Sequence, residues 1–319
     1  MRGNRVLDIS RAYGRQVNDK DSKRRNDTAG LIESLQALSA SLLEIIKAGQ
    51  ETMAELAKLE EAAGTGSLED CIFSLGDSPL VAPIPMPPLL LHFESHEGHV
   101  KSLHSKLHGD GEGIPDIWYQ FPHYYYGNSH GLSGHNADIM FPDGEAEMDF
   151  ELEFAAVIGQ DISDVSAKEA EDAIVGYTII NDWAARSLER KCVSLGLGPT
   201  MAKNFATSMG PYLVTKDEVP DPYNLKMTVK INEEVVSTAM THEARYSFGE
   251  MISFASEGNS LPAGTIICSG ACANGCGAEI GRYLKSGDVV DLEIQDIGTL
   301  RNRVSDKRRA PVYARRSTK

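Results

Sequence analysis

Hydrophobic residues follow a helical spacing early in the chain and a strand spacing later. Between residues 30 and 64, leucine and isoleucine recur every three or four positions among Ala, Glu and Lys, which predicts a helix. Gly64 and Gly66 end this pattern. Prolines at five positions from 79 to 88 exclude regular helix and mark a linker or domain edge. We therefore place a boundary near residue 72, between a partly helical N-terminal region, 1–72, and a larger domain, 73–319.

Strand patterns dominate after this boundary. Short runs rich in β-branched and aromatic residues predict strands at 150–158, 173–180, 212–215, 225–231, 265–268 and 289–294. Only two segments, 167–173 and 247–256, have a helical pattern. Turn residues at 232–233, 262–264 and 286–288 separate neighbouring strands. The predicted fold class is therefore α+β and rich in β-structure.

Three carboxylates lie at the ends of the two most apolar of these strands. Glu151 and Glu153 alternate with Leu152, so a strand places both carboxylates on one face. The run 155–158 that follows is apolar on both faces, which predicts a buried strand. Asp182 follows the second apolar run. Adjacent carboxylates that enter a core repel each other unless a cation or a proton lies between them.

Each carboxylate also has an ordinary structural interpretation. Glu151 and Glu153 could face water on an amphipathic strand, and Asp182 could be the N-cap of a helix that begins near Ala184. The buried run argues against the first interpretation, whereas the second stays open. A set of three oxygen ligands without a thiolate would favour magnesium, manganese or calcium over zinc. Such an ion would chelate adjacent substrate oxygens and stabilise an enolate.

Charge and hydropathy narrow the class of protein. The chain has 319 residues, a formal net charge of −15 and 41% hydrophobic residues, so it can bury a core and would repel nucleic acid and anionic membranes. No apolar run approaches the roughly 18 residues of a membrane span, and the polar start lacks the apolar stretch of a signal peptide. We expect a cytoplasmic protein with neither nucleic-acid nor membrane partners. We interpret the basic run from Arg301 to Arg316 as a solvated tail.

Cysteine usage does not indicate disulfides. The chain has five cysteines, an odd number without a secretory context. Cys268, Cys272 and Cys276 recur at four-residue intervals and could form a soft-metal site if a fourth ligand lay nearby. The simpler interpretation is that they are small residues in a glycine-rich turn.

Several segments, taken together and in order, resemble the fumarylacetoacetate hydrolase superfamily. They are 149–159, 181–186, 202–205, 209–215, 284–290 and 298–302. The resemblance covers about residues 73–304, and the combination is more specific than any single motif. It implies a mixed β-roll catalytic domain, a homodimer, a small oxo substrate, and a magnesium ion, with manganese or calcium as alternatives, held by Glu151, Glu153 and Asp182.

The resemblance also implies a general base and a lysine beside the substrate. His99 matches the base histidine of the family, Glu279 matches its partner glutamate, and Lys203 matches a lysine next to metal and substrate. A carboxylate partner orients such a histidine and stabilises its charged form. Without the resemblance, Lys203 would be an ordinary solvated lysine, and His99 could not be chosen over the other histidines nearby, which are His92, His96, His104 and His108.

The chain departs from the family pattern at three positions. His92 stands where longer members place an aspartate in or near the metal shell, so it could be a nitrogen ligand or a lost one. Glu189 replaces a substrate-binding glutamine, and Ala271 replaces a threonine that contacts the substrate carboxylate. The changes at Glu189 and Ala271 should each weaken binding of an acidic substrate by about 1–3 kcal/mol. They therefore favour a larger or less acidic substrate. Arg186 and Tyr126 complete the expected substrate-binding residues.

These observations predict metal-dependent hydrolysis of a carbon–carbon bond in an acylpyruvate-like or fumarylacetoacetate-like β-dicarbonyl compound. His99 and Glu279 would activate water, and the departing carbon would leave as an enolate stabilised by the metal. The alternative is an isomerase, hydratase or decarboxylase of a 2-oxo acid that uses the same metal site. A non-catalytic binding protein on this fold is the third reading, and the retention of the three carboxylates and Lys203 argues against it.

Overall fold

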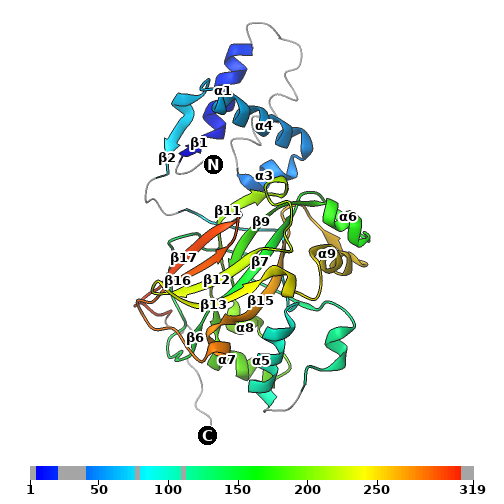
Figure 1. Ribbon diagram of the computed structural model, residues 1–319, viewed down its shortest axis with the longest axis vertical. Coiled ribbons are helices and arrows are strands. Elements are labelled where there is room, and N and C mark those ends of the chain that lie inside the picture. Colours follow the sequence, from blue (N-terminus) through cyan, green and yellow to red (C-terminus); the bar gives the residue numbers. More distant parts are fainter. Residues whose placement is uncertain (1–4, 21–40, 76–79, 109–112, 310–319) are drawn as a thin grey trace. The chain divides into compact units, whose positions relative to one another are not determined.

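The computed structural model describes residues 5–20, 41–75, 80–108 and 113–309. The chain divides into two compact units, Met1–Ser78 and Pro79–Lys319. The predicted boundary near residue 72 falls at the start of strand β2 (Ile72–Ser74), which pairs antiparallel with β1 (Arg5–Leu7). The first unit therefore extends a few residues beyond that boundary, because its last strand pairs with its first (Figure 1).

Helices form most of the first unit. They are α1 (Ile9–Lys20), α3 (Leu42–Lys47), α4 (Gln50–Gly64) and a short 3-10 turn, Glu69–Cys71. Their apolar faces enclose a small core of Ala12, Tyr13, Ile45, Leu59, Leu68 and Cys71. The single helix predicted over 30–64 is wrong within 41–64, because Gly49 has φ +78° and separates α3 from α4. The rest of that prediction, residues 30–40, lies outside the described residues.

A six-stranded sheet forms the centre of the second unit. Its strand order is β11 (Ser208–Thr215), β9 (Ile174–Asn181), β7 (Glu151–Ile158), β15 (Ile266–Cys276), β3 (Leu90–Phe93) and β4 (Tyr124–Tyr126). Neighbours are antiparallel except β15 and β3, which are parallel. Every residue of β7 is buried, which confirms the buried strand predicted at 155–158.

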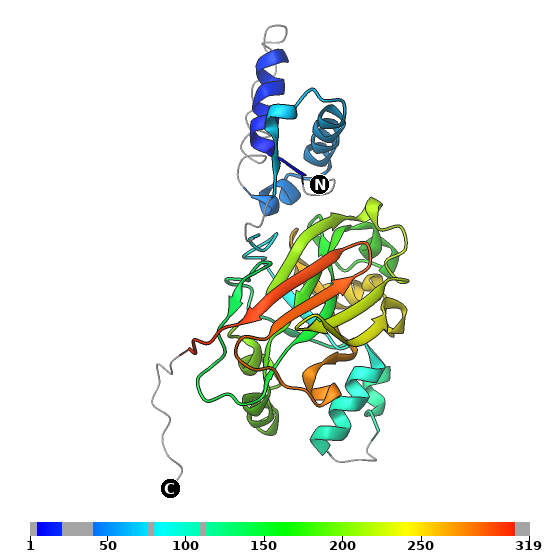
Figure 2. The ribbon, with the colours of Figure 1, turned by 60° about the vertical axis from the view of Figure 1, so that its left-hand side comes forward.

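A five-stranded sheet packs against the first. Its order is β13 (Glu234–Met240), β12 (Lys226–Ile231), β16 (Val289–Ile294), β17 (Gly298–Val304) and β5 (Asp138–Ile139). Apolar side chains from both sheets share one core, as Leu152 and Phe154 of β7 and Val229 of β12 illustrate. Figures 1 and 2 show the strands of the second sheet crossing over β7 and β9.

Smaller elements complete the second unit. Two two-stranded sheets pair β10 (Ala184–Ala185) with β6 (Met148–Asp149) and β14 (Ser260–Leu261) with β8 (Ile162–Ser163). The helices are α5 (Glu97–His108), α6 (Ala167–Asp172), α7 (Arg186–Ser194), α8 (Thr200–Lys203), α9 (Phe248–Ser256) and α10 (Gly277–Ile280). The 3-10 turns are Asp116–Tyr119, Lys216–Glu218 and Thr241–Glu243. Among the described residues, no helix has both the length and the hydropathy that a membrane crossing requires.

The predicted β-rich α+β class is confirmed. Both predicted helices exist, and each begins with a capping box, Ser166 with Glu169 in α6 and Ser247 with Glu250 in α9. The sequence pattern missed α5 and α7, because both helices are predominantly polar and offer only a few apolar residues from which a helical spacing could be recognised.

Two smaller expectations were wrong. Cys268, Cys272 and Cys276 lie in β15 rather than in a glycine-rich turn, and all five cysteines are buried and reduced. The start of the basic run is a strand rather than a solvated tail, because Arg301 lies in β17, where its guanidinium forms an ion pair with Asp291. The end of that run, residues 310–316, lies outside the described residues.

Strand pairing brings the predicted site residues to one end of the six-stranded sheet. Leu152 pairs with Asn181, so the start of β7 lies beside the end of β9, and Asp182 follows directly. Ala271 of β15 pairs with Glu153. His92 of β3 pairs with both Cys268 and Tyr125, which places an imidazole next to the carboxylates.

Candidate active site

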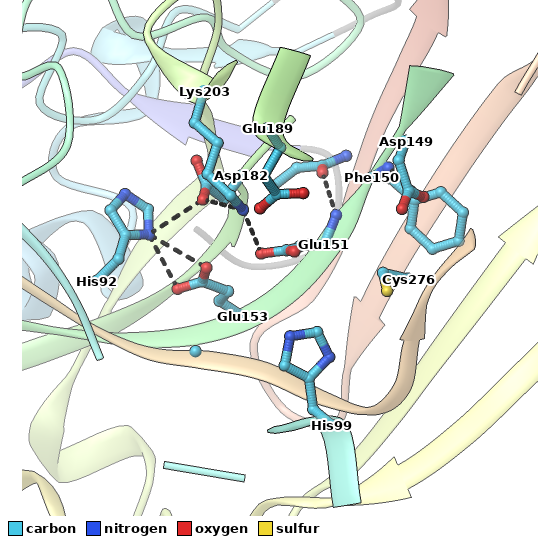
Figure 3. Close-up of polar contacts among 12 residues, drawn as sticks. His92, His99, Asp149, Phe150, Glu151, Glu153, Asp182, Glu189, Lys203 and Cys276 are labelled. Carbon is cyan, nitrogen blue, oxygen red and sulfur yellow. Dashed lines mark hydrogen bonds and ion pairs between the residues drawn. The ribbon is translucent and has the colours of Figure 1, made fainter. Parts of the chain in front are cut away.

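Glu151, Glu153 and Asp182 form one buried cluster. Their exposed fractions are 4%, 1% and 1%, and one carboxylate oxygen from each lies within 4.8 Å of the others. The interpretation of the two glutamates as solvent-facing is therefore wrong. Asp182 is not a helix N-cap either, since α7 begins at Arg186 after Ala185 and no side chain caps it. The three carboxylates face one another at the end of the sheet (Figure 3).

Lys203 supplies one of the cations that this cluster requires. It ends α8 and is 5% exposed, and its Nζ donates hydrogen bonds to Glu151 Oε2 at 2.6 Å and Asp182 Oδ2 at 2.7 Å. Burial opposes ionisation of Glu151, but the charges of Lys203 and Arg186 outweigh burial and lower its pKa well below the ordinary value. Lys203 is thus a buried ion-pair partner of two carboxylates rather than a solvated lysine.

Arg186 supplies the second cation and is occupied by three carboxylates. Its guanidinium donates to Asp149 at 2.7 Å, Glu151 at 2.6 Å and Glu189 at 2.7 Å. Asp149 also accepts backbone N–H bonds from Gly277 and Ala278, although burial still raises its pKa. These contacts commit all three guanidinium nitrogens of Arg186 to protein carboxylates.

His92 lies against the other side of the carboxylate cluster. Its Nδ1 is 3.1 Å from both carboxylate oxygens of Glu153 and 3.8 Å from Asp182 Oδ2 (Figure 3). The ring stacks on Tyr125 with the ring centroids 5.1 Å apart, and the Tyr125 hydroxyl donates a hydrogen bond to Asp182. Burial raises the pKa of Glu153, and the neighbouring His92 lowers it. The charges of Asp182 and Glu151 also raise it, so the pKa of Glu153 lies above the ordinary value.

His99 and Glu279 form a second buried pair. His99 Nδ1 lies 2.8 Å from Glu279 Oε2, and the imidazole, 5% exposed, projects from α5 toward the carboxylate cluster (Figure 3). Burial alone would lower the pKa of His99, but the hydrogen bond and charge of Glu279 outweigh it and raise that pKa. The neighbouring His96 differs, because burial lowers its pKa to about 3 and keeps it neutral. Geometry therefore singles out His99 where the sequence pattern could not.

One small cavity joins these groups. Its walls include Phe93, Leu103, Pro199 and Gly270, together with the polar or candidate residues Glu94, His99, Tyr125, Glu151, Glu153, Glu189, Lys203 and Ala271. The candidate base, lysine and two of the candidate metal ligands thus face the same space. Glu189 and Ala271, the two departures from the family's substrate contacts, face it as well.

Two of the expected substrate-binding residues, Arg186 and Tyr126, do not line this cavity, and other residues do. Tyr126 is 50% exposed and pairs with Leu91 at the sheet edge, whereas its neighbour Tyr125 lines the cavity. Glu94 also lines the cavity, and its carboxylate accepts from His123 at 2.9 Å. Sequence patterns did not reveal Glu94, because it lies in an acidic, histidine-rich stretch without periodicity. The run of tyrosines at 124–126 suggested aromatic pocket walls but did not distinguish Tyr125 from its neighbours.

The buried charges fit a divalent cation. In the described part of the chain, Arg186 and Lys203 are the permanently charged cations paired with Asp149, Glu151, Asp182 and Glu189, and Glu153 adds a fifth carboxylate to this group. The excess of negative charge and the hard oxygen donors are those that magnesium-like ions require. Glu151, Glu153 and Asp182 have the mutual spacing to hold such an ion.

The mixed two-sheet fold and its buried carboxylate cluster define the class as a β-rich enzyme domain with a candidate divalent-metal site. A family model described as fumarylacetoacetate (FAA) hydrolase C-terminal matches residues 93–305. The chain belongs to the fumarylacetoacetate hydrolase family, which confirms the resemblance seen in its motifs.

Relatives in this family carry out different reactions. The chain is 30% identical over 277 residues to the oxaloacetate tautomerase YisK of Bacillus subtilis, covering 85% of this chain and 88% of that protein. A 2-hydroxyhepta-2,4-diene-1,7-dioate isomerase from Mycobacterium marinum matches with a TM-score of 0.58, 30% identity, and coverage of 73% and 80% of the two chains. Fumarylacetoacetate hydrolase from Exiguobacterium antarcticum matches with a TM-score of 0.64, 25% identity, and coverage of 85% and 90%. Family membership therefore indicates the kind of enzyme and leaves the reaction open.

Proposed function

We propose that this protein is a divalent-metal-dependent enzyme that moves a proton to and from a small β-dicarbonyl or 2-oxo compound. The observation that supports this proposal most strongly is the buried His99–Glu279 pair, whose imidazole lines the same cavity as Glu151 and Glu153. Metal-assisted proton transfer at a carbon next to a carbonyl requires a general base and, within its reach, a group of carboxylates that can hold the metal.

Each residue has a defined task in this proposal. Glu279 accepts the hydrogen bond of His99 Nδ1 and so leaves Nε2 as the basic nitrogen. Glu151, Glu153 and Asp182 would hold the divalent ion, which when bound supplies a Lewis acid for two neighbouring substrate oxygens. The Lys203 ammonium, buried beside these carboxylates, stabilises negative charge that develops on a substrate oxygen.

The leading reaction is hydrolysis of a carbon–carbon bond. His99 Nε2 takes a proton from water, and the hydroxide oxygen forms a bond to the distal carbonyl carbon. The bond from that carbon to the α-carbon then breaks, and its electron pair leaves with the α-carbon as an enolate. The proton held by His99 passes to the α-carbon, so one water is consumed and two products form.

Keto–enol tautomerisation is the second candidate. It is favoured by the similarity over most of the chain to a protein named as an oxaloacetate tautomerase. In this reaction His99 removes a proton from the α-carbon and the substrate oxygen is protonated in its place, without water and without bond cleavage. The same base and the same carboxylates serve both reactions.

The walls of the cavity favour a substrate with little negative charge. Glu94 and Glu189 add carboxylates to the cavity, and Ala271 offers no hydroxyl. Arg186 already binds three protein carboxylates. We therefore propose a β-dicarbonyl compound with one carboxylate or none, in preference to a dicarboxylate such as oxaloacetate.

A substrate panel tests both the reaction and the charge preference. Acylpyruvates, oxaloacetate, oxo-dienoates and uncharged β-diketones are each incubated with the enzyme and manganese in oxygen-18 water and, separately, in deuterium oxide. Hydrolysis places oxygen-18 in the acid product, whereas tautomerisation exchanges the α-hydrogen without cleavage. We expect Glu189→Gln to raise kcat/KM for dicarboxylates and to leave uncharged diketones unaffected.

Two variants serve as controls for the panel. Glu153→Gln removes a candidate metal ligand, and His99→Asn removes the candidate base, so neither should turn over any substrate at a comparable rate. Full activity in Glu153→Gln would refute the carboxylate site, and full activity in His99→Asn would refute the base.

A further inference from the structure

His92 occupies a position that suits a metal ligand. It is fully buried, and its Nδ1 lies 3.1 Å from both oxygens of Glu153 and 3.8 Å from Asp182 Oδ2. When two ligand atoms each lie about 2.1 Å from one ion and the ligand–ion–ligand angle is a right angle, the two ligand atoms are about 3 Å apart. The spacing between Nδ1 and the two carboxylates is thus of the size found within one coordination shell.

The structure holds this imidazole in place from two sides, by Tyr125 against its face and by Gly127 beside its Nε2. Its ring is parallel to that of Tyr125, with an interplanar angle of 8°. Tyr125 in turn donates its hydroxyl to Asp182, which ties the stacked ring to the same cluster. Behind the ring lies Gly127, where an added Cβ would be 2.7 Å from His92 Nε2, so the absence of a side chain at 127 makes room for the imidazole. These contacts leave the ring little freedom to point elsewhere.

We infer that His92 Nδ1 is a nitrogen ligand to the divalent ion, beside the oxygen ligands Glu151, Glu153 and Asp182. A shell of three carboxylates and one imidazole favours manganese, iron(II), cobalt or zinc over magnesium and calcium, because imidazole nitrogen suits first-row transition metals better than hard cations. This inference rests on the proposed function, since it concerns the same metal site. It names the ligand that would determine which metal the site selects.

An ion pair is the competing explanation of the same distances. A protonated His92 would donate its Nδ1–H to Glu153 and act as a third cation for the carboxylates. In that state Nδ1 has no lone pair for a metal. Distances alone do not distinguish the two states, because a hydrogen bond and an edge of a coordination shell have similar lengths.

Pulsed electron paramagnetic resonance of the full chain loaded with manganese(II) distinguishes them. A directly bound imidazole produces nitrogen modulation of the manganese signal, and nitrogen-15 labelling of histidine changes that modulation without any substitution. His92→Asp replaces the nitrogen by an oxygen donor. His99→Asn is the matched control, because it removes a different buried imidazole, which lines the cavity beside Glu151 and Glu153. Cys268→Ser separates nitrogen from sulfur ligation, since Cys268 clusters with His92 and Glu153.

We expect label-sensitive nitrogen modulation in the natural protein, in His99→Asn and in Cys268→Ser, and its loss in His92→Asp. Titrations of the same proteins with manganese and magnesium should show that His92→Asp reduces the preference for manganese by about tenfold or more. If His92→Asp does not fold, the isotope experiment on the natural protein decides alone.

Three results would count against these ideas in different ways. Manganese that binds specifically, with affinity lost in Glu153→Gln, but shows no nitrogen modulation would overturn the role of His92 and establish the ion pair. Absence of any manganese binding that depends on Glu153 would instead refute the metal site of the proposed function. Nitrogen ligation without turnover of any substrate would leave His92 as a ligand and refute the reaction alone.

Discussion

At the scale of single residues, the site depends on how buried charges are paired. Glu151 and Asp182 share the ammonium of Lys203, and Glu151 shares the guanidinium of Arg186 with two further carboxylates. In a buried setting, removing one member of such a network leaves the other charges uncompensated, which costs far more than losing an exposed pair. The chain offers both kinds of pair for comparison.

Lys203→Met should destabilise the metal-free protein by about 3–5 kcal/mol, because Glu151 and Asp182 would lose their shared buried cation. Lys230→Met is the matched control, since Lys230 pairs with Glu293 on a partly exposed surface and its loss should cost about 1 kcal/mol or less. Urea unfolding with a chelator measures both values. Relative to the natural protein, added manganese should restore part of the free energy of unfolding lost in Lys203→Met, but none of that lost in Lys230→Met. Equal losses in the two variants would contradict the network.

The His99–Glu279 pair predicts a pH dependence. Glu279 raises the pKa of His99, and a general base works when neutral, so kcat/KM should rise with pH through a value above the ordinary 6.5. In Glu279→Gln the charge that raises this pKa is gone, so the rise should move to lower pH while the plateau falls by about 100-fold. Profiles of kcat/KM against pH, recorded with the same metal, measure both effects. An unchanged midpoint would show that Glu279 does not act on His99.

At the scale of elements, β15 contributes Gly270 and Ala271 to the cavity through an irregular register. The pairing of β15 with β7 shifts between Cys268 and Ala271 and again before Cys276. Gly270 lies at the first shift with φ +81°, a backbone conformation that side chains rarely adopt. The strand bends there past β3, so Ala271 faces the cavity opposite Glu153.

Gly270→Ala should therefore be costly in two ways. Besides the strain of a positive φ, its Cβ would lie 2.2 Å from the carbonyl oxygen of Phe93, so the backbone must shift. Gly258→Ala is the matched control, because φ is +60° there and no atom lies within 4 Å of the added Cβ. We expect a loss of about 1 kcal/mol for Gly258→Ala and at least about 3 kcal/mol for Gly270→Ala, measured by denaturant unfolding. Similar losses would mean that β15 tolerates the shift.

At the scale of the whole molecule, each unit has its own hydrophobic core. The core of the first unit is built on residues from Ala12 to Cys71, and that of the second on residues from Leu91 to Val304. Every candidate site residue lies in the second unit. The homodimer implied by the family resemblance stays a prediction, as does the role of the first unit.

A fragment that begins at Pro79 should fold cooperatively and bind manganese as tightly as the full chain. Calorimetric unfolding and metal titration check this, with Glu153→Gln in the fragment as the control. Light scattering of both proteins tests the dimer. If the full chain is dimeric and the fragment monomeric, residues 1–78 contribute to the dimer contact. Loss of metal binding in a folded fragment would show that the first unit contributes to the site.

The sequence by itself determined the β-rich class, both predicted helices of the second unit and the neighbourhood of the three carboxylates. These follow from short-range patterns: strand alternation, the helical spacing of apolar residues, and charges beside an apolar run. The tertiary structure decided what depends on partners distant in the chain. Strand pairing brings His92 to Glu153, and the fold brings Glu279 to His99, a pairing that only the family resemblance had implied. Packing shows that Tyr125, rather than Tyr126, faces the cavity. Residue type and local periodicity carry no information about such neighbours, because contacts across a sheet join segments whose separation along the chain is unrelated to their separation in space.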